Sequence, residues 1–569
     1  MNRTKAAAFL AMLVAAIGLI AASGNRAAPA AQPADLVLTN GAVFTVDPAR
    51  PNAQAVAVRG DRIVAVGSSA EMRQWIGPKT RVIDLGGRFA MPGFNDAHTH
   101  MAEAGAAKLE VDLTGARSLG EFQQRLRAAL PRYKPGQWMV GRGWDHTLWP
   151  VKKFPTRTDL DVVSRDRPMF LTRMDGHVAV ANSLALRLAG ITRSTADPPG
   201  GHIVKDPKTN QPDGMLEETA KELVARKIPP PTPAERRHAL LLAIADADSH
   251  GVTSVSDFSA WQDFLAYRRL RAEGKLTVRI TEWIPFELPL GQLEQMRREG
   301  GAGDLWLKVG ALKGFLDGSF GSETAAMFQP YSDNPQDTGI LRMDPKQVIP
   351  MTIERDRAGF QINFHAIGDR AVHLGLDAFE AAAKANGPRD RRDRIEHAQV
   401  IAPDDFARFE NLGVIASMQP CHLNDDVRWA TQRLGPERSE TAYAWATVLR
   451  DHIHFAVGTD YPVERINPMG NLWACVTRQT PQGWPAGGWE PQEKISMADC
   501  IRGYTAGSAY AEFEEKDLGE LKPGMLADIV VLSRNPLTIA PVELWRTETV
   551  LTIAGGRIVY NRLPGPISR

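Results

Sequence analysis

Eight short apolar segments, each about the length of a β-strand, recur between helix-like stretches along the middle of this chain. They lie at residues 91–100, 251–258, 277–285, 305–317, 359–368, 393–399, 413–420 and 452–462. Strands that alternate with helices favour a parallel sheet, and eight such strands close a (β/α)₈ barrel. We therefore predict an α/β fold with a TIM-like barrel over residues 91–517.

The spacing of these segments is uneven. A plain barrel needs ~250 residues, and most of the excess here lies between the first segment and the second. We predict an insertion over about residues 101–250, after the first barrel strand, that forms a lid or a substrate subdomain.

Both ends of the chain are β-rich and are broken by Gly, Asn and Asp. Short runs of this kind are typical of small sheets joined by tight turns. Two such ends around a long middle predict one small domain built from both termini, with residues 35–90 as its first part and residues 518–569 as its second.

The first residues are typical of a secretory signal peptide. Arg3 and Lys5 precede an apolar run that ends in small residues near residue 24. The run falls short of the ~20 apolar residues of a spanning helix, although an uncleaved anchor stays open. We predict a signal peptide at residues 1–24, a linker at residues 25–34, and a periplasmic or secreted mature protein.

The composition is that of an ordinary globular protein, with a net charge of +1, 43% hydrophobic and 23% charged residues. It argues against disorder, a many-pass membrane protein and a dedicated nucleic-acid binder. We expect a small-molecule substrate, no nucleic acid and no membrane contact beyond the export signal. A homo-oligomer stays open.

The chain has only 3 cysteines, at positions 421, 475 and 500. An odd and widely spaced set does not form a disulfide framework or a thiolate zinc site, although one bridge stays open. Any metal must therefore be held by His and carboxylate side chains.

The strongest chemical signals stand at the carboxyl ends of the predicted strands, where a barrel positions its catalytic groups. His98 and His100 are two apart, so that both imidazoles point to the same side of a strand. His365, His397 and Asp460 end later strands. Together these side chains form a ligand set for one or two divalent metal ions.

Lys313 ends the segment at residues 305–317. A lysine beside metal ions is electrostatically disfavoured unless its charge is removed. Carbamylation by CO₂ would remove that charge and create a carboxylate that bridges two metals. Lys313 could instead bind substrate as a cation or point outward. Lys308 on the same segment is a second candidate, but it is less well placed.

The motifs MPGFNDAHTH, LKGFLDGS, NFHAIGD, IEHAQ, MQPCHLNDD and GTDYPV occur in this order. In this order they resemble the amidohydrolase superfamily, and more narrowly amidohydrolase family three, which includes N-substituted formamide deformylase-like enzymes. The resemblance covers the chain after the signal peptide and implies that its two ends form a β-sandwich. It also implies a metal site, with Zn²⁺ as the expected ion and iron or manganese as alternatives. In that site one ion is held by His98, His100 and Asp460, a second by His365 and His397, and N6-carboxylysine at Lys313 bridges them.

Such a site implies hydrolysis of a C–N bond in an amide, formamide or cyclic amide. Metal-activated water, with its pKa lowered toward ~7, attacks a polarised carbonyl. Asp460 would carry the proton to the leaving nitrogen. Esterase activity, isomerisation or hydration at the same metals, and a non-catalytic periplasmic binding or regulatory role remain alternatives.

Five further residues lie in segments that resemble family signatures near the pocket. We predict that they contact substrate, with core packing for Trp144 and loop support for two of the histidines as the competing interpretation. They are Trp144, His146, His177, His422 and Asp426.

Overall fold

A computed structural model describes residues 32–174, 176, 178–198 and 201–563 of the chain. The predicted signal peptide at residues 1–24, most of the predicted linker and His177 lie outside these described residues. Within the described part, no helix combines the length and the apolar character that a membrane crossing requires.

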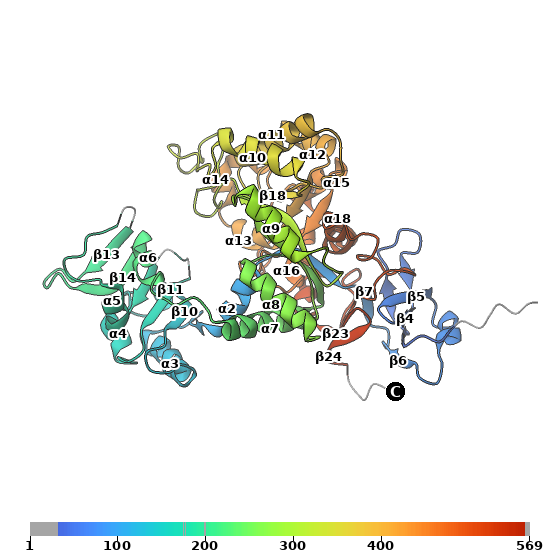
Figure 1. Cartoon of the computed structure of the whole chain (residues 1–569), viewed down its shortest axis with the longest axis horizontal. Coiled ribbons are helices and arrows are strands. Elements are labelled where there is room, and N and C mark those ends of the chain that lie inside the picture. The colour runs from blue at the N-terminus through green and yellow to red at the C-terminus, as the bar shows by residue number, and fades with distance from the viewer. Residues whose placement is uncertain (1–31, 175, 177, 199–200, 564–569) are drawn as a thin grey trace, which may run out of the picture.

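Eight parallel strands form the barrel at the centre of Figure 1, and their order around the sheet follows their order in the chain. Each strand lies within one of the eight predicted segments, so the predicted TIM-like barrel is confirmed. The strands are β8 (Phe94–Thr99), β15 (Val252–Phe258), β16 (Arg279–Pro285), β17 (Leu307–Phe315), β18 (Ile362–Ala366), β19 (Arg394–His397), β20 (Ile415–Met418) and β21 (Phe455–Val457).

The segment that follows β21 closes the barrel against β8. The Asp460 N–H donates to the His98 carbonyl over 2.8 Å, and the His100 N–H donates to the Tyr461 carbonyl over 2.7 Å. Thr99 and Tyr461 form a parallel bridge at the same point. Closure therefore brings the ends of the first and last strands together, with the candidate ligands of both.

Helices cover the outside of the barrel, and local sequence signals set their ends. Helix α7 begins with a capping box between Thr232 and Glu235 and ends at Gly251, whose φ of 78° suits glycine. The other helices of this part are α8 (Trp261–Ala272), α9 (Leu290–Gly300), α10 (Pro345–Arg357), α11 (Asp369–Asn386), α12 (Phe406–Leu412), α13 (Leu423–Asp426), α14 (Ala430–Ser439), α15 (Trp445–Arg450), α16 (Met469–Thr477), α17 (Met497–Arg502) and α18 (Ser508–Ala511), after α7 (Pro233–His250). A disulfide between Cys475 and Cys500 joins α16 to α17, while Cys421 is free and buried.

Strands from both ends of the chain share one sheet beside the barrel. Strand β7 (Phe89–Pro92) pairs antiparallel with β22 (Ile529–Leu532) and parallel with β2 (Ala42–Phe44). This sheet also contains β24 (Arg557–Asn561), β23 (Thr549–Ala554) and β3 (Asn52–Ala53). A second sheet contains β5 (Arg62–Gly67), β4 (Ala55–Arg59), β1 (Leu36–Thr39) and β6 (Arg81–Asp84).

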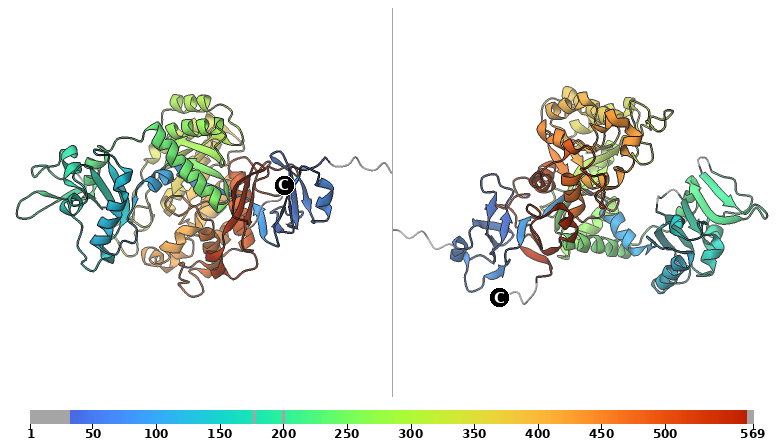
Figure 2. Two further views of the ribbon diagram at one scale, coloured as in Figure 1. Left: turned by 90° about the horizontal axis from the view of Figure 1, so that it is seen from below. Right: turned by 180° about the vertical axis from the view of Figure 1, so that it is seen from behind.

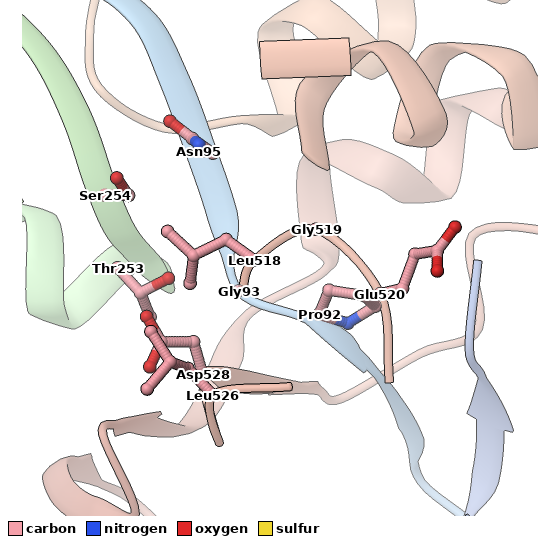
Figure 3. A pocket seen from close by; sticks show the side chains of 10 residues that line it. All are labelled: Pro92, Gly93, Asn95, Thr253, Ser254, Leu518, Gly519, Glu520, Leu526 and Asp528. Atoms are coloured by element: carbon pink, nitrogen blue, oxygen red, sulfur yellow. The ribbon is translucent and has the colours of Figure 1, made fainter. Parts of the chain in front are cut away.

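A cavity of about 10 Å³ lies where the first of these sheets meets the amino ends of the barrel strands. Figure 3 shows Asn95 and Ser254 on neighbouring strands at this cavity, with Gly519 on a loop across from them. A space of this size holds about one water molecule. It is therefore too small for a substrate and lies at the opposite end of the barrel from the carboxyl ends of the strands.

Residues 111–225 form a lobe with a sheet of its own, which we call the insertion lobe. Figures 1 and 2 show it standing apart from the barrel, with α2 (Met101–Leu109) leading toward it and α7 packed beside α2. Its strands and helices are β9 (Val111–Asp112), α3 (Leu119–Ala129), β10 (Met139–Trp144), α4 (Arg157–Asp161), β11 (Met169–Arg173), β12 (Val178–Ala181), α5 (Ser183–Ala189), β13 (Gly201–Lys205), β14 (Pro212–Glu218) and α6 (Glu222–Ala225).

Candidate active site

The end of β8 supplies two histidines whose rings are each oriented by one nitrogen. His98 Nδ1 lies 2.7 Å from Glu396 Oε2, and His100 Nδ1 lies 3.1 Å from the Phe258 carbonyl oxygen. The Nε2 atoms face Asp460 Oδ1, at 3.5 Å from His98 and 3.1 Å from His100. An imidazole that donates from one nitrogen presents the other as a lone pair, which is the arrangement of a metal ligand.

Asp460 completes this first group. Its carboxylate and the two imidazoles offer ligand atoms that all lie within 4.8 Å of one another. Its backbone has a φ of 57°, a left-handed conformation that costs energy in a non-glycine residue and is often found at functional sites. Burial by itself raises the pKa of Asp460, but the close contact with His100 outweighs burial and holds the pKa below its usual range. The carboxylate is therefore ionised and suited to bind a cation.

His365 and His397 form a second pair, with ring centroids 4.4 Å apart. His365 Nε2 lies 2.8 Å from the Gly318 carbonyl oxygen, and His397 Nδ1 lies 2.8 Å from Gln419 Oε1. Burial, assisted by the charge of Lys313, lowers the pKa of His365 to about 3. Both rings are therefore held neutral, with His365 Nδ1 and His397 Nε2 left as the free nitrogens, and neutral imidazole is the form that binds metal.

Lys313 points into the barrel, where it is fully buried. Its Nζ lies 2.9 Å from His98 Nε2 and 5.0 Å from the centre of the Phe315 ring. Burial lowers the pKa of Lys313 to about 8, so that a neutral amine, the form that reacts with CO₂, is accessible near neutral pH. The alternative prediction that Lys313 points outward is therefore wrong.

Lys308 lies near the start of the same strand and is not part of this group. Its Nζ lies 2.8 Å from Glu514 Oε1 and 2.7 Å from the Glu512 carbonyl oxygen. Both partners follow the last helix of the barrel, at the amino end of the strands. Lys313 is thus the lysine of the two that the fold brings to the histidines.

The donor set fits a divalent metal ion. His98, His100 and Asp460 offer two imidazole nitrogens and one carboxylate around one point, and His365 and His397 offer two further nitrogens beside them. Zinc, iron and manganese all accept nitrogen and oxygen ligands of these kinds.

Glu396 is a site residue that the sequence analysis did not single out. It is completely buried, and its Oε2 accepts hydrogen bonds from His98 Nδ1 and, over 2.8 Å, from Ser417 Oγ. Its Oε1 lies 2.7 Å from Arg394 Nε. Side chains alternate along a strand, so Arg394 and Glu396, two residues apart, share one face of β19. This spacing was the sequence pattern that could have identified them as a pair.

Asp96 was also not singled out, and it joins β8 to the segment that carries Asp460. It accepts hydrogen bonds from the Thr459 N–H over 2.9 Å and from Thr459 Oγ1 over 2.6 Å. Tyr504 donates a third over 2.9 Å. Burial raises the pKa of Asp96 to about 6, although these hydrogen bonds oppose the shift.

Asn471, on α16, holds two strand ends in place and was likewise missed. Its Oδ1 accepts from the Cys421 N–H over 2.8 Å, and its Nδ2 donates to the Gly458 carbonyl over 3.0 Å. Cys421 precedes His422 and Gly458 lies two residues before Asp460. No local pattern connects a helical asparagine to these two loops.

One of the predicted substrate contacts, His422, lies beside the histidine cluster. His422 Nε2 is 3.8 Å from Asp460 Oδ2, and its ring stacks on that of His397 at 5.9 Å. Gln399 Nε2 donates to His422 Nδ1 over 3.2 Å. Asp426 accepts a hydrogen bond from the Tyr443 hydroxyl, and burial raises its pKa to about 7.

The structure places Trp144 and His146 in the insertion lobe and not beside the histidine cluster. Trp144 is fully buried in the core of the insertion lobe, where its Nε1 donates to the Leu171 carbonyl over 2.8 Å. The His146 ring packs 4.0 Å from the ring of Phe154, also in that lobe. Trp144 therefore packs in a core, as the competing interpretation expected.

Comparison with known proteins extends over nearly the whole described chain. A family model described as the amidohydrolase family matches residues 81–560. Protein LONG AFTER FAR-RED 3 of Arabidopsis thaliana is 37% identical over 544 residues, which cover 94% of this chain and 92% of that protein. N-substituted formamide deformylase of Arthrobacter pascens is 29% identical over 550 residues, which cover 93% and 98% of the two chains.

A solved structure gives the same result. An uncharacterized metal-dependent hydrolase from Pyrococcus furiosus superposes with a TM-score of 0.74 at 31% identity. The alignment covers 88% of this chain and 100% of that one. The barrel and the domains around it are therefore shared with a hydrolase that depends on metal.

Proposed function

This chain belongs to the amidohydrolase family, and from that membership we propose that it is an exported, metal-dependent hydrolase of C–N bonds in amides, formamides or cyclic amides. The observation that carries this function is the buried convergence of His98, His100 and Asp460, whose ligand atoms lie within 4.8 Å of one another. The Arthrobacter pascens relative, which is named as a deformylase of N-substituted formamides, supports the choice of a C–N bond.

When bound, a divalent ion lowers the pKa of water toward ~7 and polarises a substrate carbonyl. His98, His100 and Asp460 would hold one such ion, with Zn²⁺ as our proposal, and His365 and His397 a second. Glu396 fixes the ring of His98 through the hydrogen bond to Nδ1. Lys313, proposed to carry a carboxylate after reaction with CO₂, would lie between the two groups.

Asp460 is the proton carrier in this mechanism. Its Oδ1 faces the two β8 histidines, while its Oδ2 lies 3.8 Å from His422 Nε2 and has no closer ion-pair partner among the described residues. That oxygen would accept the proton of the attacking water and deliver it to the leaving nitrogen. His422, on the same side, would hold the substrate carbonyl or the departing group.

We propose that the protein acts in the periplasm or outside the cell. Residues 1–24 have the order of charged, apolar and small residues that defines an export signal. The disulfide between Cys475 and Cys500 agrees with an oxidising compartment, because such bridges are rare in the cytosol. An assembly of several copies remains part of this proposal.

A paired experiment tests the activity. The purified protein is assayed for metal content by mass spectrometry and for release of amine from chromogenic anilides, formanilides and matched esters. We expect bound metal and amine release, and in Asp460→Asn a loss of turnover of about 10²- to 10⁴-fold with the fold retained. Metal-loaded protein that hydrolyses none of these amides, or an Asp460→Asn variant with full activity, would contradict the proposal.

A further inference from the structure

Tyr461 directly follows Asp460 and is buried at the point where the barrel closes. Its carbonyl accepts the His100 N–H over 2.7 Å, and its own N–H donates to Thr459 Oγ1 over 3.3 Å. Asp460 has a φ of 57°, a conformation that costs energy in a non-glycine residue. The short turn that carries Asp460 therefore needs contacts from outside itself to keep its shape.

The side chain of Tyr461 supplies one such contact, because it reaches helix α7. Its hydroxyl donates to Asp246 Oδ2 over 2.7 Å, although the two residues are 215 positions apart in the chain. The same oxygen lies 2.6 Å from Lys108 Nζ on α2, and that ammonium lies 6.0 Å from the centre of the Tyr461 ring. We call Lys108, Asp246 and Tyr461 the stem triad, since these contacts connect all three.

The stem triad stands on the two helices that join the barrel to the insertion lobe. Helix α2 begins directly after His100 and ends at Leu109, two residues before the lobe, while α7 follows the lobe in the chain. Gly105 of α2 packs so closely on the Ala239 carbonyl of α7 that no β-carbon fits between them. Figure 1 shows the two helices side by side. Such close packing makes the pair one rigid support for the triad.

Burial differs among the three members and indicates which contact matters most. The side chains of Lys108 and Asp246 are 36% and 21% exposed, and an ion pair at such a position contributes little by itself. Tyr461 is only 6% exposed, and a hydrogen bond to a carboxylate is stronger than one between neutral groups. The bond from the Tyr461 hydroxyl is therefore the contact that ties the turn to α7.

We infer that Tyr461 is a positioning residue for the metal ligands, and that its hydroxyl acts by tying the turn of Asp460 to α7 through Asp246. The inference rests on the proposed metal site of the hydrolase. Asp460 precedes Tyr461 in the chain and the Tyr461 carbonyl holds the backbone of His100, so a shift of Tyr461 moves two ligands of the same ion. Loss of the hydroxyl would loosen the metal group without removing any of its ligand atoms.

The test measures zinc affinity by competition with a chromophoric chelator, beside urea unfolding of the metal-free protein. Tyr461→Phe should weaken zinc binding by about 10-fold, the lower end of the range for loss of an outer partner of a metal ligand. Asp246→Ala should have the same effect. The double variant should bind zinc no more weakly than either single variant, because both changes break one hydrogen bond. Asp246→Asn keeps an oxygen acceptor and should recover most of the affinity.

Tyr510→Phe is the matched control, since it removes the same atom from a ring that stacks on His454 at 4.0 Å, away from the stem triad. It should leave zinc affinity unchanged. In turnover of an anilide that the parent enzyme hydrolyses, Tyr461→Phe should lower kcat by a larger factor than it raises KM. The reason is that Asp460 shifts while the groups that bind the substrate stay in place.

The positioning role and the proposed hydrolysis fail separately. Unchanged zinc affinity in Tyr461→Phe, a loss in the double variant equal to the product of the two single losses, or a loss that only follows the amount of unfolded protein would overturn the positioning role. Weaker zinc binding in Tyr461→Phe, with a parent enzyme that releases no amine from any amide, would leave that role intact and refute the hydrolysis. A parent protein that binds no zinc would overturn both.

Discussion

Glu396 provides the sharpest test of how the barrel interior supports the metal ligands. In Glu396→Gln, the hydrogen bond to His98 Nδ1 loses its charge while the size of the side chain is kept. A hydrogen bond to a charged group contributes about 1.5–3 kcal/mol, and loss of an outer carboxylate lowers metal affinity by about 10- to 100-fold, or about 1.4–2.7 kcal/mol. The two estimates agree, so we expect the zinc affinity to fall by about 10- to 100-fold.

The same substitution should cost less stability than removal of a buried ion-pair partner normally does. Arg394 keeps Glu512 Oε1 at 2.8 Å and Ser417 Oγ at 2.7 Å after Glu396 is neutralised. Breaking a buried pair costs about 3–5 kcal/mol when the remaining charge is stranded. Because Arg394 is not stranded here, we expect the unfolding free energy to fall by about 1–2 kcal/mol.

The assay is competition for zinc against a chromophoric chelator at pH 7.5, beside urea unfolding of the metal-free protein. Glu380→Gln, at a side chain that is 61% exposed on α11, is the control. Unchanged zinc affinity in Glu396→Gln would refute the reasoning. An affinity loss that merely follows the fraction of unfolded protein would refute it as well, since the effect would then be one of folding.

Asn471→Ala removes the acceptor of the Cys421 N–H and the donor to the Gly458 carbonyl. We expect kcat to fall by a larger factor than KM rises, and the unfolding free energy to fall by about 1–3 kcal/mol. Steady-state kinetics and urea unfolding measure the two effects. The disulfide closes a loop with a sequence separation of 25. Replacing both Cys475 and Cys500 with serine should therefore lower the unfolding free energy by about 3 kcal/mol, and an unchanged melting temperature would contradict this expectation. Burial raises the pKa of Asp248 from 3.8 to about 7, so the folded state binds its proton more tightly and the unfolding free energy should fall as pH rises from about 4 to about 7. Asp248→Asn should remove that slope and add about 1–3 kcal/mol at pH 8, which pH-dependent unfolding curves would reveal. Lys313→Ala should lower the metal content per chain, measured by mass spectrometry, while the melting temperature changes little. An unchanged metal content would show that Lys313 only packs in the barrel.

Much of the fold could be predicted because barrel strands carry local signals. Each run of apolar residues in the middle of the chain is long enough for one strand, and the eight runs appear in the chain in the order in which they pair. Residues at the ends of such strands share one rim of the barrel, so the strand pattern alone was enough to group His98, His365 and Asp460. The strand pattern also favoured Lys313 over Lys308, because Lys313 is the one that stands near the carboxyl end of its strand. Whether Lys313 points into the barrel or outward could not be read from that pattern, and the structure shows its side chain fully buried.

The predicted contacts in the insertion lobe show where motif reading stops. Trp144 and His146 stand in segments that resemble family signatures, yet the lobe folds around a core of its own and Trp144 fills it. Whether a tryptophan packs in a core or faces a ligand depends on which surfaces a domain buries, and no short pattern reports that.

The sequence by itself determined the strand order, the family and the side chains that stand at the carboxyl rim. The reason is that strand periodicity and the chemistry of each residue depend only on short runs of neighbouring residues. Only the tertiary structure decided which groups support them. Glu396 meets His98 across 298 residues of chain, and Asn471 reaches two separate loops from one helix. These contacts arise from closure of the barrel and burial of its interior, where every buried charge must find a partner, however distant that partner is along the sequence.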